Sequence, residues 1–270
     1  MTAKSLKVAA LQMLSVPDWQ MNLSTAARLI KEAASNSARL VVLPEFFIQI
    51  CAPELKDRFA IAEELGNGVI QTELARLAVE HQVYLLAGSI PLKSAIMDKY
   101  YNAALMYAPD GNLLCAYNKI HLFKFNDGVV AYDEGVNFVA GDKVICCEID
   151  GFKVGLSICY DLRFPELFRV MGVVDVILLP SAFTYQTGLA HWELLVRARA
   201  VENQCYFVAV NQGGEHESGR KTYGHSLICD PWGEVLASCA EGEQIIYAEL
   251  SSLRLQEVRS KLPALEHRKL

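Results

Sequence analysis

Short apolar segments alternate with amphipathic segments along this chain, and the two patterns predict strands and helices respectively. Runs of mainly apolar residues between polar ones predict buried strands at 6–13, 40–43, 83–89, 176–179 and 206–211. Helical spacing, or a proline suited to a first helical turn, predicts helices at 22–35, 69–81, 165–171, 189–204 and 253–262. Helices and strands therefore alternate at both ends of the chain, which indicates an α/β fold.

The middle and the end of the chain carry turn sequences typical of hairpins. Strand-like segments flank these turns at 101–108 and 113–120, at 144–149 and 152–158, and around 230–233. We therefore expect sheets sandwiched between helical layers. A short repeat also suggests two similar halves, because Val-Val-Leu-Pro at 41–44 and Ile-Leu-Leu-Pro at 177–180 each follow a helix and a strand. Four residues alone are too few to establish a repeat.

Size and charge narrow the class of protein. A chain of 270 residues with a mean hydropathy of +0.20 can bury a large core. No linker-like segment divides it, so we expect one domain over residues 1–270. The formal net charge is −6 and the basic residues are scattered, which speaks against a nucleic-acid or membrane surface. The longest apolar runs, such as 173–180, are too short to cross a bilayer.

The eight cysteines indicate a reducing compartment, and we expect a cytoplasmic protein. Residues 1–7 lead directly into a predicted strand, so we expect no signal peptide. The cysteines form no Cys-x-x-Cys pair, and the six histidines lack ligand spacing beside them. We therefore expect no metal site, and each cysteine is by default a small buried apolar residue.

Three segments share one form, a buried strand that leads into a reactive side chain. They end in Glu45, Lys119 and Cys159. Functional groups gather where strands leave an α/β sheet at their carboxyl ends. A buried Glu or Lys requires a partner, and Glu45 and Lys119 suit each other. The alternative is a structural ion pair beside an ordinary core cysteine.

The residues after Cys159 favour the chemical interpretation. Tyr160-Asp161-Leu162-Arg163-Phe164-Pro165-Glu166 predicts a turn into a helix. Backbone N–H groups and the positive helix end at such a junction favour a thiolate, and they can also hold an oxyanion. A Cys–His pair would instead need His191 or His225, and neither histidine lies in a sequence block of that kind.

The same segments resemble the signature blocks of the nitrilase superfamily of carbon–nitrogen hydrolases. They are Leu-Pro-Glu45, Asn-Lys119-Ile-His-Leu-Phe and Cys159-Tyr-Asp-Leu-Arg-Phe-Pro-Glu. The resemblance continues through 179–183, 191–193, 197–203, 223–226 and 230–233. It covers nearly the whole chain, with its weakest stretch between Lys124 and Lys143.

The resemblance implies a four-layer αββα sandwich that pairs through helices into a homodimer or a larger homo-oligomer. It implies catalysis without a metal or organic cofactor, with Glu45 as general base, Lys119 as electrostatic stabiliser and Cys159 as nucleophile. Glu134 in Tyr-Asp-Glu-Gly matches a supporting glutamate that commonly lies between the lysine and cysteine blocks. Cys159 would attack the amide carbonyl and form a thioester, while Lys119 and the backbone N–H of Tyr160 hold the oxyanion.

The later blocks are most similar to the deaminated glutathione amidases, which release 2-oxoglutarate and cysteinylglycine. Omega-amidases, which act on 2-oxoglutaramate and 2-oxosuccinamate, share nearly all of these blocks, and a nitrile substrate is a further alternative. The segment between His121 and Gly141 departs from both groups, and we expect it to border the pocket. An interaction scaffold without activity is the alternative outside enzymes, against which the intact Glu-Lys-Cys set argues.

Arg163 is a candidate for binding a substrate carboxylate, because it follows the nucleophile and its guanidinium is a planar fork. The alternative is that Arg163 pairs with Asp161 or Glu166 and only shapes the start of the helix.

Overall fold

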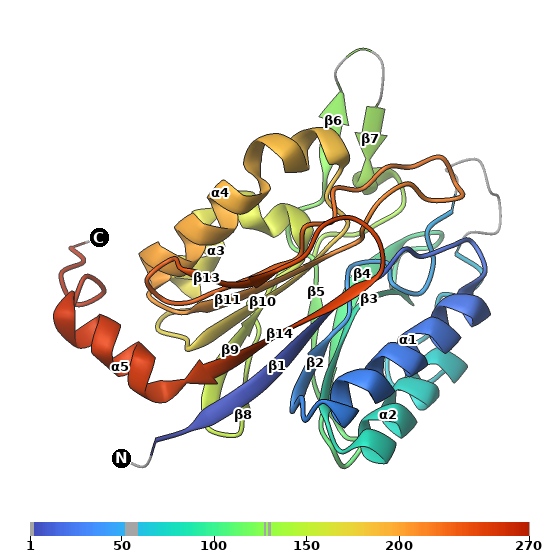
Figure 1. Cartoon of the computed structure of the whole chain (residues 1–270). Helices are drawn as coiled ribbons and strands as arrows, with labels where there is room; N and C mark the ends of the chain where they lie inside the picture. Colours follow the sequence, from blue (N-terminus) through green and yellow to red (C-terminus); the bar gives the residue numbers. More distant parts are fainter. Residues whose placement is uncertain (1–2, 52–58, 127, 129–130, 270) are drawn as a thin grey trace.

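Two six-stranded sheets pack face to face between two pairs of helices in the computed structural model (Figure 1). The structure describes residues 3–51, 59–126, 128 and 131–269. The layers follow in the order helix, sheet, sheet, helix, which confirms the predicted αββα sandwich.

The first sheet has the strand order β14-β1-β2-β3-β4-β5. Its strands are β1 (Ser5–Gln12), β2 (Leu40–Val42), β3 (Tyr84–Lys93), β4 (Tyr100–Tyr107), β5 (Leu113–Asn118) and β14 (Gln244–Ser251). Helices α1 (Trp19–Ser35) and α2 (Val69–His81) cover its outer face. The Asp18 carboxylate accepts hydrogen bonds from the first backbone N–H groups of α1, which explains why this helix begins three residues before the predicted start.

The second sheet has the order β13-β12-β11-β10-β9-β8. Its strands are β8 (Cys146–Ile149), β9 (Phe152–Leu156), β10 (Val176–Ser181), β11 (Tyr206–Asn211), β12 (Leu227–Cys229) and β13 (Val235–Ser238). Helices α3 (Pro165–Val170) and α4 (Tyr185–Asn203) cover its outer face, and α5 (Ser252–Lys261) follows β14. A separate hairpin, β6 (Lys124–Asn126) with β7 (Ala131–Asp133), projects from the edge of the sandwich.

Both faces of the central strands are buried, which is why they are apolar throughout. In β1, Val8 and Ala10 contribute to the core between the sheets, whereas Ala9 and Leu11 contribute to the core under α1 and α2. This alternation follows from the two-residue period of a strand. A strand covered on both sides reads as a continuous apolar run.

The two sheets repeat one pairing pattern. The pairs β1–β2 and β2–β3 are parallel, as are β9–β10 and β10–β11. Antiparallel strands follow on the same side, β4 and β5 in one sheet and β12 and β13 in the other. Strands β2 and β10 hold equivalent places, so the repeated Leu-Pro sequences mark the same point in two similar halves.

The structure corrects three details of the predicted elements. Helix α4 begins at Tyr185 instead of 189, because Gly188 interrupts the helical pattern of the sequence but fits against Tyr223. Strand β14 was absent from the prediction, since this edge strand buries only Ile246 and Leu250 fully. The short hairpin β6–β7 was also missed, because its strands have three residues each.

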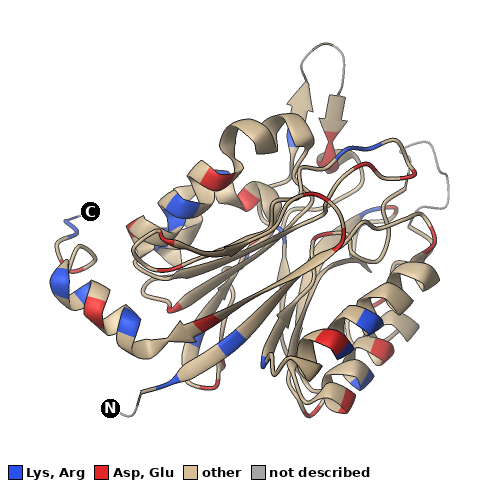
Figure 2. Ribbon diagram, viewed as in Figure 1, with Lys and Arg blue, Asp and Glu red and all other residues tan. Residues whose placement is uncertain are grey.

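Charged residues of both signs are mixed on the exposed helices, as the scattered sequence pattern predicts (Figure 2). Within the described ranges, none of the helices is both long enough and apolar enough to span a bilayer.

Candidate active site

The predicted reactive residues meet at one edge of the sandwich, between the two sheets. Glu45 lies just beyond β2, Lys119 directly follows β5, and Cys159 lies three residues beyond Leu156, the last residue of β9. Strand β5 runs in the same direction as β2 and β3, because both the β3–β4 and β4–β5 pairs are antiparallel. All three side chains therefore come from the carboxyl ends of strands, as expected for a functional site in α/β sheets.

Glu45 is fully buried and its carboxylate is held from three directions. Oε1 accepts hydrogen bonds from Asn102 Nδ2 at 2.8 Å and from Lys119 Nζ at 2.8 Å. Oε2 accepts from the backbone N–H of Ala182 at 2.8 Å. Ala182 follows β10, so the second sheet fixes the carboxylate that the first sheet supplies. These donors orient the side chain and stabilise its charged form.

The backbone around Glu45 depends on a bulge in β3. A Cβ atom at Gly88 would lie 1.9 Å from the carbonyl oxygen of Leu43, so only glycine allows this close approach. Ser89, the next residue, accepts a hydrogen bond from Phe46 N at 2.9 Å through its hydroxyl oxygen. The bulge therefore holds the segment that carries Glu45.

Lys119 lies between two carboxylates. Its ammonium contacts Glu45 Oε1 at 2.8 Å and Glu134 Oε2 at 2.8 Å, and only 1% of the residue is exposed. Glu134 also accepts from Phe123 N at 2.8 Å. Glu134 Oε1 also accepts a hydrogen bond from the ammonium at 3.0 Å, so three carboxylate oxygens surround Nζ.

Cys159 begins a 3-10 turn, Cys159–Arg163, in a left-handed backbone conformation with φ of 47°. Non-glycine residues with positive φ are uncommon and cost about 1–3 kcal/mol, and they concentrate at functional sites. The turn places Cys159 beside Glu45 and Lys119, whose charges both act on its thiol. Of the eight cysteines, this is the one that adjoins the buried ion pair.

The protonation states follow from burial and charge. Burial raises the pKa of Glu45, but the Lys119 ammonium, together with Cys159 and the charge of Arg220, holds the pKa below its usual value. Burial opposes the charge of Lys119, yet Glu134 and Glu45 raise its pKa well above normal. Burial, followed by the charge of Glu45, raises the pKa of Cys159 well above its ordinary value. Burial also raises the pKa of Glu134.

The thiolate expected at Cys159 is therefore not the favoured form, although the backbone N–H of Ala182 does lower the pKa of the thiol. The thiol is buried beside the negative charge of Glu45, and these two effects exceed the attraction of Lys119. Cys159 is followed by a short 3-10 turn, and the six-residue helix α3 begins only at Pro165, so helix dipoles add little at the thiol. The resting site combines a neutral thiol with a charged carboxylate.

Asp161 ties the Cys159 turn to the segment that carries Lys119. Its buried carboxylate accepts hydrogen bonds from Tyr117 Oη at 2.6 Å, from Ile158 N at 2.8 Å and from His121 N at 3.1 Å. The carboxylate is thus committed to structure. This explains why Asp161 is unavailable to Arg163.

Arg163 lies on the wall of the inner pocket that contains Cys159 and Tyr160. Its Nη2 lies 3.3 Å from His191 Nδ1, and its guanidinium lies 5.5 Å from the centre of the Phe183 ring. Within the part of the chain that the structure describes, Arg163 forms no ion pair with Asp161 or Glu166. The pairing with Asp161 or Glu166 is therefore not formed, and Arg163 lines the pocket instead.

Neither histidine considered as a partner of Cys159 occupies that position. His191 contacts Arg163, and His225 stacks on Tyr223 with ring centres 4.3 Å apart. The Cys–His alternative thus receives no support among the described contacts.

Three groups at the site were missed by the sequence analysis. Asn102 and the N–H of Ala182 bind Glu45, and Arg220 lines the pocket from a polar loop. Asn102 interrupts an apolar strand, and that interruption was a usable signal. Arg220 had no such signal, because Glu-Ser-Gly-Arg-Lys is typical of any exposed loop.

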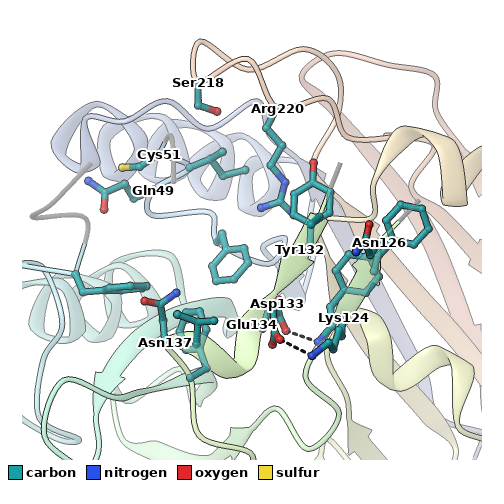
Figure 3. A pocket seen from close by; sticks show the side chains of 18 of the residues that line it. Gln49, Cys51, Lys124, Asn126, Tyr132, Asp133, Glu134, Asn137, Ser218 and Arg220 are labelled. Atoms are coloured by element: carbon teal, nitrogen blue, oxygen red, sulfur yellow. Dashed lines mark hydrogen bonds and ion pairs between the residues drawn. The ribbon is translucent and has the colours of Figure 1, made fainter. Parts of the chain in front are cut away.

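A cavity of about 850 Å³ (Figure 3) adjoins the inner pocket, because Phe123, Glu134 and Arg220 line both. The hairpin β6–β7 borders this cavity, as predicted for the segment between His121 and Gly141. Residues 127 and 129–130 of that segment lie outside the described residues.

The loop that carries Arg220 is anchored by a buried histidine. His216 Nδ1 lies 2.9 Å from Ser15 O, and Nε2 lies 2.8 Å from Thr222 Oγ1. Burial, aided by the nearby Arg220 charge, lowers the pKa of His216 to about 4. The ring is therefore neutral near pH 7.

This pKa predicts a loss of stability in mild acid. The unfolded chain binds a proton at His216 below pH 6.5, whereas the folded chain does so only below about pH 4. The neutral His216 ring contributes about 3 kcal/mol to the free energy of unfolding above pH 6.5, and this contribution disappears as the pH falls to 4. Urea unfolding of wild type and His216→Gln between pH 7 and 4 tests it. The free energy of unfolding should fall more steeply with decreasing pH in the wild type than in the variant. Parallel pH profiles would contradict the prediction.

The fold and the buried Glu-Lys-Cys cluster define the class of protein, and comparison with known proteins gives the family. Residues 7–260 match the carbon–nitrogen hydrolase family, and the chain belongs to it. It is a hydrolase of carbon–nitrogen bonds other than peptide bonds.

Relatives of known name cover the chain from end to end. It is 42% identical to the deaminated glutathione amidase of Synechocystis sp., over 98% of both chains. It is 35% identical to Omega-amidase NIT2 of Homo sapiens, over 100% of this chain and 96% of that protein. The crystal structure of Saccharomyces cerevisiae Nit3, of branch 10 of the nitrilase superfamily, superposes with a TM-score of 0.87 at 33% identity, covering 99% of this chain and 97% of that one.

Proposed function

We propose that the chain is a cysteine-dependent amidase that hydrolyses a small amide bearing a carboxylate through a thioester at Cys159. The observation that carries the proposal is the buried contact of Glu45 with Lys119 beside a neutral thiol. A thiol with a raised pKa requires a base to become a nucleophile, and the adjacent carboxylate is charged.

In the first half of the reaction, Glu45 takes the thiol proton while Sγ of Cys159 attacks the amide carbonyl carbon. Negative charge develops on the carbonyl oxygen, and the Lys119 ammonium and the backbone N–H of Tyr160 hold it. Glu45 then gives the proton to the nitrogen as the carbon–nitrogen bond breaks. The amine departs, and the acyl group remains on sulfur as a thioester.

In the second half, Glu45 takes a proton from water, and the hydroxide attacks the thioester carbon. The carbon–sulfur bond breaks, the carboxylic acid leaves, and the proton returns to Sγ. Glu134 supports the cycle because its carboxylate balances the charge of Lys119 throughout. One carboxylate thus serves both half-reactions, and no cofactor is required.

For the substrate we propose deaminated glutathione, with omega-amides and then nitriles as alternatives. The 42% identity to a deaminated glutathione amidase supports the first choice over the omega-amidases.

Arg163 would bind the carboxylate of the acyl group, since it faces the inner pocket and has no carboxylate partner among the described ion pairs. A fixed cation there orients the carbonyl for attack.

A substrate panel tests this choice. We expect the highest kcat/KM for deaminated glutathione, lower values for 2-oxoglutaramate and 2-oxosuccinamate, and least for a matched nitrile. Release of cysteinylglycine or ammonia provides the measurement, with Cys159→Ala as the control. Faster hydrolysis of the omega-amides would assign the enzyme to that activity. No hydrolysis of any member would favour an interaction scaffold.

We also propose one domain over residues 1–270, a cytoplasmic location and a homodimer or larger homo-oligomer without nucleic-acid or membrane partners. Helix α4 supports self-association, because Leu189, Leu194 and Val201 are 65%, 68% and 48% exposed. Several exposed apolar residues on one helix are consistent with a surface that a second copy covers.

A further inference from the structure

We infer that Arg220 recognises a carboxylate on the amine side of the substrate, and thereby selects N-substituted amides over primary amides. This inference rests on the proposed function and adds a second anion site to it. Arg163 would then bind the acyl side in the inner pocket, while Arg220 binds the leaving group at the entrance to the outer cavity.

Arg220 has donors without acceptors. Its Nη2 donates to the carbonyl oxygen of Ala182 at 3.1 Å, but its buried Nε has no hydrogen-bond partner among the described residues. A buried donor of a charged group that lacks a partner is unfavourable, so an incoming acceptor would be bound there. The neighbouring acids are engaged elsewhere, since Lys124 pairs with Asp133 and Lys119 pairs with Glu134. None of the described ion pairs therefore joins this guanidinium to a carboxylate, although its charge acts on Glu45 without direct contact.

The guanidinium is held in place before any ligand arrives. Its carbon lies 6.0 Å from the centre of the Phe46 ring and 5.8 Å from that of Tyr132, and Figure 3 shows the side chain reaching into the cavity beside Tyr132. The loop is fixed by the hydrogen bond from His216 N to Arg220 O at 2.9 Å. A guanidinium already held between two aromatic rings loses little conformational entropy on binding an anion, and its planar fork of N–H donors suits a carboxylate.

Arg220 stands where a leaving group would lie. Arg220 lines both the inner pocket and the outer cavity. It donates a hydrogen bond to Ala182 O, and the N–H of the same residue donates to Glu45, so Ala182 links the two side chains. Glu45 donates the proton to the departing nitrogen in the proposed mechanism. The substituent on that nitrogen would thus extend past Arg220 into the outer cavity.

The outer cavity suits an amine larger than ammonia. Its volume is about 850 Å³, which is within the range of sites for whole small molecules. Aromatic side chains form much of its wall, among them Phe46, Phe123, Tyr132 and Phe138. Lys124 also lines the cavity but is paired with Asp133, so Arg220 is the lining cation without a carboxylate among the described ion pairs. An apolar substituent with a terminal carboxylate matches this combination of aromatic wall and unpaired cation.

The test compares two substrates with the same scissile bond, deaminated glutathione and its derivative with the glycine carboxylate replaced by a carboxamide. We expect wild type to favour the carboxylate form in kcat/KM by roughly 10- to 100-fold, as for one hydrogen-bonded charge. Arg220→Met should remove most of this preference. Arg163→Met is the matched control, because it should slow both substrates and keep the preference.

The ratio of the two kcat/KM values does not depend on how much enzyme is folded, so instability of a variant cannot produce the result. Arg220→Lys, which keeps the charge but not the fork, should retain part of the preference. An unchanged ratio in Arg220→Met, with active wild type, would overturn the role of Arg220 and leave the proposed function standing. Wild type inactive on both substrates would instead overturn the proposed function and this inference with it.

Discussion

Replacing Glu45 with Gln is expected to lower kcat by roughly 10³–10⁴-fold, near the upper range for a general acid–base group. The physical reason is the neutral thiol: burial and the charge of Glu45 keep the pKa of Cys159 high, so attack requires proton removal by the carboxylate. The same group must then protonate the amine and activate water. Steady-state turnover with purified Glu45→Gln measures the loss.

A second readout separates this role from that of a structural ion pair. The negative charge of Glu45 is, after burial, the largest cause that raises the pKa of Cys159. In Glu45→Gln the pKa of the thiol should fall, so iodoacetamide should modify Cys159 at lower pH than in wild type. An amide leaves one donor near Asn102 or Ala182 unpaired, which costs about 1–3 kcal/mol of stability. A folded variant with normal turnover would refute the assignment.

Lys119→Gln is expected to lower kcat by roughly 10²–10³-fold, because it removes the cation that meets the developing oxyanion. Lys119→Arg should also lower kcat, since a planar guanidinium does not fit where a compact ammonium contacts Glu45 and Glu134. Turnover of both variants, measured beside their thermal unfolding, tests the prediction. Near-normal activity in Lys119→Arg would contradict it.

The stability of these variants requires its own control. Removing Lys119 leaves two buried carboxylates without a cation, and breaking a buried pair costs about 3–5 kcal/mol. The double variant Lys119→Gln, Glu134→Gln removes one of those charges together with the cation. It should recover much of the stability without recovering turnover. Recovery of both would show that Lys119 serves the fold alone.

The layers of the fold were predictable because the apolar pattern encodes burial directly. Strand β1 and helix α2 were predicted to within about one residue, since each has a clear period and clear ends. Strand β14 could not be recognised, because an edge strand that buries few side chains lacks a continuous apolar run. Its place beside β1 depends on contacts between opposite ends of the chain.

Glu45, Lys119 and Cys159 were predictable because each follows a buried strand, where a polar or reactive residue has a marked cost. The distances between them were not, because they arise from two sheets packing together. Arg220 could not be predicted for a different reason. A cation in a polar loop has no burial cost, so the sequence pattern does not distinguish it. Only the folded chain shows its unpaired Nε beside the pocket.

The repeated halves explain how the site is assembled. Glu45 follows Leu-Pro at the end of β2, and Ser181 follows Leu-Pro at the equivalent end of β10. The next residue, Ala182, donates its N–H to Glu45. The same strand end therefore supplies the carboxylate in one half and the group that holds it in the other.

The most direct test of the central claim is to measure the mass of the peptide that contains Cys159 during turnover. Wild type mixed with deaminated glutathione, quenched in acid within milliseconds and digested, should yield the Cys159 peptide with a 2-oxoglutaryl group in thioester linkage. The other cysteines should remain unmodified, and Cys159→Ala should give neither the adduct nor product. An acyl group on a different residue, or turnover that survives in Cys159→Ala, would contradict the account.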